Sequence, residues 1–166
     1  HGIYLKGPFF YEPLIRVPLI VSAPGTVRAQ RSMALVELTD LAQTVLDAAG
    51  LPHAPGMQGR SLWPLLTGKV DPGEHRDDLY TEYYNASPWH RDPAANLTMV
   101  RTATHKLVVN HSDSDGELYD LVRAPCEPHN LGDDPASRSV KEALLLRLCN
   151  RMAWTMDPLP HRRSAW

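Results

Sequence analysis

The sequence has few cysteines, little net charge and no long apolar run. Its 166 residues include two cysteines, Cys126 and Cys149, which are too few for a disulfide framework, so we expect free thiols. A membrane-spanning helix needs about 20 consecutive apolar residues. No stretch approaches that length, so no membrane partner is predicted. The net charge of −2 arises from scattered charges, which exclude the strong field that gathers nucleic acid.

The apolar content of the chain is sufficient for a core. A hydrophobic share of 43% over 166 residues fits one ordinary domain, or one part of a larger domain. Residues 16–22 are rich in Val, Leu and Ile, which predicts a strand buried on both faces of an α/β sheet. Thr39 and Asp40 are suited to cap a helix over residues 40–49, which Gly50 would end.

Beyond residue 73 the pattern changes to short strands. Four stretches are rich in β-prone residues, and we predict strands over 79–84, 97–102, 106–110 and 117–121. The second and third are close enough to form a hairpin through residues 103–105. Asp134 and Pro135 then open a long helix. Its apolar stripe, which we expect to pack on the antiparallel sheet, consists of Val140, Leu144, Leu148 and Met152.

The first residues carry the clearest chemical signal. His1 and Lys6 lie five residues apart, ahead of the predicted buried strand, so we expect the chain to begin inside an active site. Trp89 and His90 lie in a loop between two predicted strands. An aromatic ring beside a base suits an anionic sugar or aryl group, so we expect this pair to contact substrate.

Several short motifs follow one another along the chain. They are His1-Gly2, Lys6-Gly7-Pro8-Phe9, Tyr11-Glu12, Arg16-Val17-Pro18-Leu19-Ile20, Leu38-Thr39-Asp40-Leu41-Ala42, Gly56-Met57-Gln58-Gly59-Arg60-Ser61-Leu62, Met99-Val100-Arg101-Thr102, His105-Lys106-Leu107 and Glu117-Leu118-Tyr119-Asp120-Leu121. This ordered succession resembles the C-terminal part of the sulfatase family, which belongs to the alkaline-phosphatase-like superfamily. The resemblance covers nearly the whole chain.

The resemblance implies an α/β fold in two parts. Residues 1–72 would form the end of the large α/β sulfatase domain. Residues 73–166 would form a small antiparallel sheet subdomain, packed by a long C-terminal helix. Lys6 matches the family's sulfate-binding lysine, and His1 matches the histidine just before it, at the pocket edge, where it would donate a hydrogen bond to the leaving oxygen. Both are therefore expected to be catalytic and substrate-binding residues.

The resemblance also implies hydrolysis of a sulfate monoester, either a small-molecule or a sugar sulfate, to an alcohol and sulfate. The family's nucleophile is a formylglycine made from the cysteine or serine of a Cys-x-Pro-x-Arg signature, and neither Cys126 nor Cys149 lies in one. We therefore expect the nucleophile to lie outside this chain, together with the residues that bind a divalent cation, calcium. The partner would be the rest of the sulfatase domain, and the chain alone would be inactive.

Two alternative functions stay open. Phosphonate monoester hydrolases and phosphodiesterases of the same superfamily use a similar cradle for a different ester. The chain could instead be a non-catalytic interaction module. Such a module would bury Leu14, Val17, Leu19 and Ile20 by itself, whereas part of a larger domain would expose some of them.

Other charged residues are expected to be structural. Arg16 stands at the start of the predicted buried strand and is expected to form an ion pair with Glu12. Arg101 and Lys106 alternate with apolar residues along two predicted strands, which favours a solvent-exposed sheet face.

Overall fold

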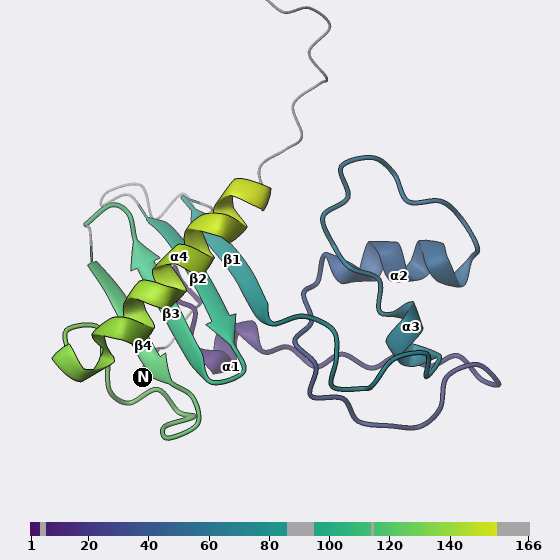
Figure 1. The fold of residues 1–166 in the computed structure, drawn as a ribbon, viewed down its shortest axis with the longest axis horizontal. Coiled ribbons are helices and arrows are strands. Elements are labelled where there is room, and N and C mark those ends of the chain that lie inside the picture. Colours follow the sequence, from purple (N-terminus) through teal and green to yellow (C-terminus); the bar gives the residue numbers. More distant parts are fainter. Residues whose placement is uncertain (4–5, 86–94, 114, 156–166) are drawn as a thin grey trace, which may run out of the picture.

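A four-stranded antiparallel sheet organises half of the molecule (Figure 1). The computed structural model describes residues 1–3, 6–85, 95–113 and 115–155. The strands are β1 (Asp78–Tyr84), β2 (Asn96–Thr102), β3 (His105–Asn110) and β4 (Asp115–Asp120), paired in the order β1-β2-β3-β4. The mixed α/β class and the small antiparallel sheet with its long helix are thus confirmed, whereas the division of the chain after residue 72 stays a prediction.

The helix α4 (Arg138–Thr155) lies across one face of the sheet. It follows a single 3₁₀ turn, Pro135–Ser137, which the Asp134 side chain caps by accepting from the Ala136 amide. The buried core between helix and sheet consists of Val100, Leu107, Leu118, Leu144 and Leu148, with Val140 and Met152 packed against it. All four members of the apolar stripe therefore face the sheet, as the sequence predicts.

The opposite face of the sheet is covered by the start of the chain. The short helix α1 (Glu12–Ile15) and the residues before it lie there, behind the strands in Figure 1. Phe10 is buried with Met99 and Val108, and Ile15 packs against this cluster. Because α4 covers one face and the N-terminal segment the other, side chains of β2 and β3 are buried on both sides.

The rest of the chain carries α2 (Asp40–Ala48) and α3 (Trp63–Leu66). The helix α2 begins and ends close to its predicted bounds, although the Thr39 side chain makes no capping bond. Its buried residues are the polar Asp40, Gln43 and Thr44, whereas Val45 is exposed. Leu41 and Leu46, the other large apolar residues of α2, are half-buried.

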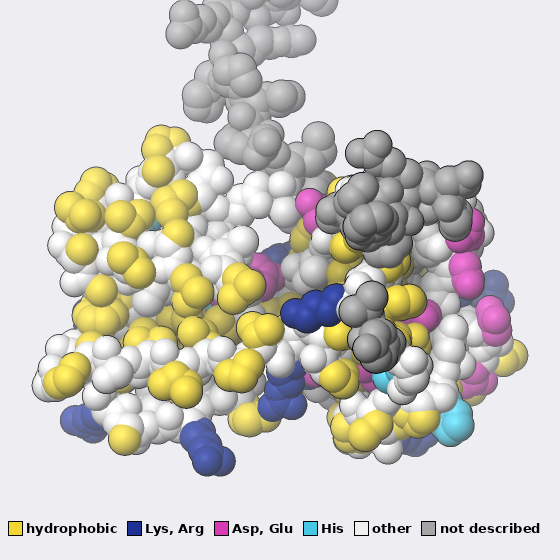
Figure 2. Space-filling model, turned by 180° about the vertical axis from the view of Figure 1, so that it is seen from behind, with side chains coloured by type: hydrophobic (Ala, Val, Ile, Leu, Met, Phe, Trp, Pro, Cys, Tyr) yellow, Lys and Arg dark blue, Asp and Glu magenta, His cyan; other side chains and the backbone are white. Residues whose placement is uncertain are grey.

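The predicted strand over residues 16–22 is wrong, because the structure shows irregular chain there. A strand buried on two faces needs neighbouring strands to pair with, and in the described part of the chain residues 16–22 pair with none. Val17, Leu19 and Ile20 are exposed, Ile20 by 91%. Figure 2 shows hydrophobic side chains spread over the half of the molecule that contains α2 and α3. Among the described helices, none combines the length and apolarity needed to cross a membrane.

Candidate functional site

Lys6 and His1 lie on the N-terminal segment that covers the sheet face opposite α4. Lys6 is exposed, and it makes no ion pair with a carboxylate of the described residues. Its ammonium is therefore available to an anion from solution. Trp89 and His90 lie outside the described residues, so their expected role in substrate contact stays a prediction.

The imidazole of His1 is held by two contacts. Its ring stacks on that of Tyr11, with centroids 3.7 Å apart and planes inclined by 13°. Its Nε2 lies 3.0 Å from the carbonyl oxygen of Cys126. Because a carbonyl oxygen can only accept, Nε2 carries the hydrogen, and Nδ1 is the ring nitrogen left for another partner.

A buried ion cluster anchors the segment just beyond Lys6. The Lys106 side chain is 0% exposed. Its Nζ donates to the Phe10 carbonyl oxygen at 2.7 Å, lies 3.0 Å from Glu12 Oε1 and forms an ion pair with Glu127. The expectation that Lys106 lies on a solvent-exposed sheet face is therefore wrong, because the N-terminal segment covers that face.

Glu12 is the second centre of this cluster. Arg101 donates to its carboxylate through Nε at 3.0 Å and Nη2 at 3.2 Å, and the Glu12 amide donates to Glu127 Oε2 at 2.8 Å. Burial would raise the pKa of Glu12, but hydrogen bonds from Arg101 and Lys106 outweigh it and lower that pKa. The expected ion pair between Arg16 and Glu12 is wrong, because Arg16 is exposed and Arg101 pairs with Glu12 instead. The expectation that Arg101 lies on a solvent-exposed sheet face is wrong as well.

A second polar cluster, formed by Tyr11, Glu117 and Tyr119, lies beside the buried ion cluster. The Tyr11 hydroxyl donates to Glu117 Oε1 at 3.3 Å, and the Tyr11 and Tyr119 rings meet edge to face at 6.2 Å. Burial raises the pKa of Glu117 and of both tyrosines, and the nearby carboxylates raise the tyrosine values further. Tyr11 therefore contacts both the ring of His1 and the half-buried carboxyl group of Glu117.

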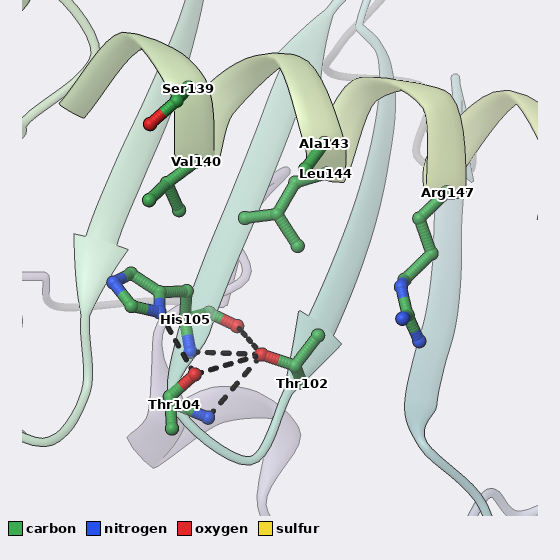
Figure 3. A pocket seen from close by; sticks show the side chains of 8 residues that line it. All are labelled: Thr102, Thr104, His105, Ser139, Val140, Ala143, Leu144 and Arg147. Atoms are coloured by element: carbon green, nitrogen blue, oxygen red, sulfur yellow. Dashed lines mark hydrogen bonds between the residues drawn. The ribbon is translucent and has the colours of Figure 1, made fainter.

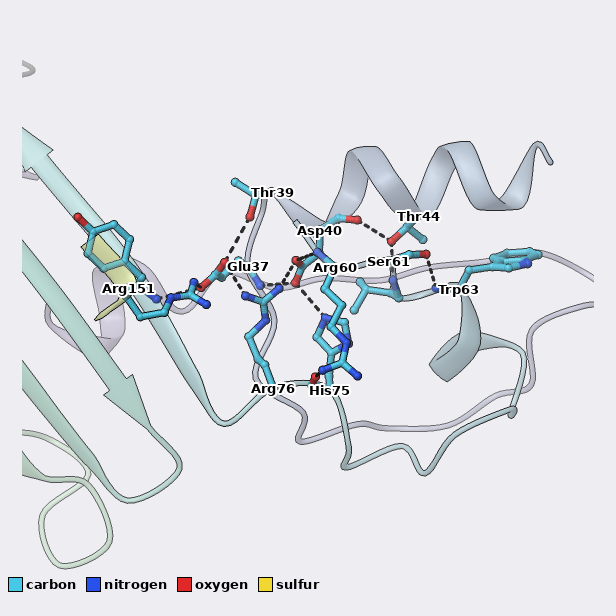
Figure 4. Close-up of polar contacts among 12 residues, drawn as sticks. Glu37, Thr39, Asp40, Thr44, Arg60, Ser61, Trp63, His75, Arg76 and Arg151 are labelled. Carbon is cyan, nitrogen blue, oxygen red and sulfur yellow. Dashed lines mark hydrogen bonds and ion pairs between the residues drawn. The ribbon is translucent and has the colours of Figure 1, made fainter. Parts of the chain in front are cut away.

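A separate network around Asp40 joins α2 to the sheet and α4 (Figure 4). Asp40 is fully buried. It forms ion pairs with Arg76 and with His75, whose Nε2 lies 3.2 Å away, and accepts from the Arg60 amide at 2.7 Å. Glu37 links this network to α4 through Arg151 at 2.6 Å. With its cations already paired, this network is structural.

Residues that could hold a metal ion do not gather in the described ranges. No group of three or more His, Cys, Asp or Glu side chains there has a suitable arrangement, so these residues do not fit a cation site. Cys126 and Cys149 are free and exposed, as expected.

A shallow groove lies between the β2–β3 turn and α4 (Figure 3). It is lined by Thr102, Thr104, His105, Ser139, Val140, Ala143, Leu144 and Arg147. Its polar groups are engaged by the turn itself, since the Thr102 hydroxyl accepts from the His105 amide at 3.0 Å. Arg147 is paired with Asp78 at 2.8 Å. The groove brings together none of the residues that the sequence marks for chemistry.

Sequence reasoning missed the roles of Lys106 and Glu127. A signal was present, because β2 and β3 carry apolar residues on both faces, with Met99 and Val108 on one and Val100 and Leu107 on the other. A sheet that is apolar on both faces is covered on both faces. A charged residue on such a sheet must then be paired.

Comparison with known proteins identifies the family. The model described as N-sulphoglucosamine sulphohydrolase, C-terminal, matches residues 1–153. An N-acetylglucosamine-6-O-sulfatase of Bacteroides thetaiotaomicron is 32% identical over 151 residues, covering 88% of this chain and 26% of that protein. The chain spans about a quarter of the length of such curated relatives.

Solved structures agree with this assignment. A phosphonate monoester hydrolase from Silicibacter pomeroyi superposes with a TM-score of 0.71 at 27% identity, over 82% of this chain and 28% of that one. A protein in complex with its substrate D-glucosamine-2-N,6-O-disulfate gives 0.61 at 26% identity, over 75% of this chain and 25% of that one. Since the family model covers almost the whole chain, the chain belongs to the sulfatase family, in the part that this C-terminal model describes.

Proposed function

We propose that the protein hydrolyses sulfate monoesters to an alcohol and sulfate, and that this chain supplies the sulfate-binding lysine, Lys6. The observation that carries the proposal is the family match, which includes residues 1–6. The exposure of Lys6 is consistent with it, because an ammonium already paired with a carboxylate would be less able to bind an anion.

Lys6 would act through charge. The nonbridging oxygens of the ester and its leaving oxygen gain negative charge in the transition state, and an ammonium held beside them lowers the energy of that state. His1 would lie at the edge of the same pocket. With Nε2–H directed at the Cys126 carbonyl, the protonated Nδ1 would be the atom that donates to the leaving oxygen.

The remaining chemistry lies outside this chain in the proposal. A formylglycine nucleophile and a divalent cation, calcium, would both be held by other parts of the protein. The cation would supply charge neutralisation for the ester oxygens. The described residues contain no group suited to bind it.

A sugar sulfate is the substrate class that the relatives favour. One relative is named an N-acetylglucosamine-6-O-sulfatase, and another is described with a sulfated glucosamine as its substrate. We propose that this protein acts on a sulfated sugar.

The same comparisons keep a phosphonate ester as the second candidate. The phosphonate monoester hydrolase from Silicibacter pomeroyi superposes with a TM-score of 0.71 at 27% identity over 82% of this chain, against 0.61 for the protein bound to the sulfated glucosamine. A tetrahedral phosphonate monoester carries its charge on the same kind of nonbridging oxygens. Lys6 could therefore serve either ester.

The exposed apolar segment favours an enzyme part over an independent interaction module. Val17, Leu19 and Ile20 are exposed, and Leu14 is half-buried, whereas a self-sufficient module would bury them. We propose that the rest of the sulfatase domain covers this segment.

The test is a Lys6→Ala substitution in the full-length protein. We expect kcat/KM for an aryl sulfate to fall by roughly 10²–10³-fold, the usual effect of removing one electrostatic donor. Lys69→Ala, at another exposed lysine, is the control and should leave the rate within about 2-fold. Unchanged activity in Lys6→Ala would refute the role of Lys6. A higher rate on an aryl phosphonate monoester than on the sulfate would favour the second candidate.

A further inference from the structure

We infer that Lys106, a buried residue of the C-terminal sheet, is a positioning residue of the sulfate site: it holds the chain segment that carries Lys6 in its working place. The inference rests on the proposed function, because it assigns a structural support to the same lysine. It makes the C-terminal sheet part of the catalytic apparatus rather than a separate appendage.

The first step is the short connection between Lys6 and the anchored chain. Phe10 follows Lys6 by four residues, and the Phe9 amide donates to the Gly7 carbonyl at 2.8 Å, which tightens the chain between them. The Phe10 side chain is 5% exposed and packs on the sheet. A displacement at Phe10 is therefore transmitted to Lys6 with little slack.

The second step is the placement of Lys106. Its Nζ lies against three oxygens of different segments: the Phe10 carbonyl at 2.7 Å, the Glu12 carboxylate at 3.0 Å and the carboxylate of Glu127. An ammonium has three hydrogens to donate. Lys106 therefore joins β3 to both the N-terminal segment and the loop after β4.

Glu127 completes the anchor from the other side. Its second carboxylate oxygen accepts from the Glu12 amide at 2.8 Å, so that main chain and side chain of Glu12 are both bound. The same loop supplies the Cys126 carbonyl that contacts His1. One loop thus holds His1 and the anchor of Lys6 together.

The charges in the cluster balance. Lys106 and Arg101 face Glu12 and Glu127, two cations against two carboxylates. A buried ion cluster of this kind is often no more stabilising than apolar residues of the same volume, because of the cost of removing charges from water. What apolar packing lacks is direction, and each contact here has a defined donor and acceptor. The arrangement is suited to fixing position.

The experiment is a double-mutant cycle in the full-length enzyme, with Lys6→Ala, Lys106→Met and the two combined, assayed for kcat/KM on an aryl sulfate. We expect Lys106→Met alone to lower kcat/KM by roughly 10–100-fold, since a displacement of about 1 Å at a catalytic group has effects of that size. In the Lys6→Ala background the same substitution should lower it by no more than about 3-fold, because residues that act as a unit are not additive.

A merely structural role would give a different result. If Lys106→Met only reduced the fraction of folded enzyme, it would lower the rate by the same factor with or without Lys6, and this outcome overturns the inference. Lys141→Met is the matched control: its Nζ donates to the Gly132 carbonyl at 2.7 Å, away from the N-terminal segment. We expect less than about a 2-fold change there.

A second variant covers the case in which Lys106→Met does not fold. Glu127→Gln keeps the side-chain shape and an oxygen for the Glu12 amide but removes one charge beside Lys106. The cycle of Glu127→Gln with Lys6→Ala is decided in the same way. A smaller loss of kcat/KM in the absence of Lys6 supports the inference, and an equal loss overturns it. Failure of the proposed function is seen separately, as full activity in Lys6→Ala alone.

Discussion

His75 is a buried titratable residue through which pH affects the stability of the fold. It is 5% exposed and donates through Nε2 to Asp40. Burial lowers its pKa from the ordinary value of 6.5; Asp40 opposes this, while the charges of Arg76 and Arg60 add to it. The folded protein therefore takes up a proton at His75 less readily than the unfolded chain does.

The sign of the pH effect follows from linkage. As pH falls below 6.5, the unfolded chain is protonated first at His75, which favours unfolding until the folded pKa is also passed. We expect the free energy of unfolding, measured by urea denaturation, to fall between pH 7.5 and 5.5. His75→Gln keeps a donor for Asp40 but cannot titrate, so part of that decrease should disappear. A slope identical to that of the parent protein would contradict the lowered pKa.

Prediction at the scale of single residues failed where burial decides the role of the residue. Lys6 and His1 follow from spacing and family pattern, and their roles stay predictions. Lys106 on β3 follows the same alternation as an exposed lysine would. Its surroundings depend on Glu12 and Glu127, which are 94 and 21 residues away along the chain. The apolar residues on both faces of β2 and β3 indicate that a charge there must be paired, but the local pattern does not identify partners so far away along the chain.

At the scale of elements, the stripe of α4 is the clearest case of agreement. Leu148 is 2% exposed and packs among the core residues of the sheet, whereas Leu146 on the outer side of the same helix is 66% exposed. We expect Leu148→Ala to lower the free energy of unfolding by about 2–5 kcal/mol. Leu146→Ala should change it by less than about 0.5 kcal/mol. Equal effects in denaturant titrations would mean that α4 does not pack as described.

Elements with local partners were predictable, and elements that need distant partners were not. The β2–β3 hairpin and the sheet beyond it pair neighbours in sequence, so periodicity and turn residues were enough. Residues 16–22 have the composition of a buried strand but find no partner strand among the described residues. The exposure of Val45 on α2 has the same explanation. In both places the sequence has the apolar residues of a buried element, but the described part of the chain provides no surface that buries them.

For the molecule as a whole, two buried polar networks hold its parts together. One joins the N-terminal segment to the sheet through Lys106 and Glu12, and the other joins α2 to α4 through Glu37 and Arg151. The segment over residues 16–22 runs through the half of the molecule that contains α2, and the apolar side chains of this segment are exposed. The charged groups of these two networks are thus paired within the described part of the chain, whereas part of its apolar surface is exposed.

That imbalance predicts association of the 166-residue chain on its own. Exposed apolar surface of this kind is covered in stable proteins, so we expect the isolated chain to bind an apolar dye and to form oligomers that grow with concentration. Ile20→Lys places a charge at the most exposed of these residues, at 91%, and should reduce both signals in sedimentation and dye titrations. Val122→Lys, at an isolated exposed residue after β4, should not. A monomer without dye binding would show that the segment finds cover within the chain, and the enzyme-part interpretation of residues 16–22 would then fail.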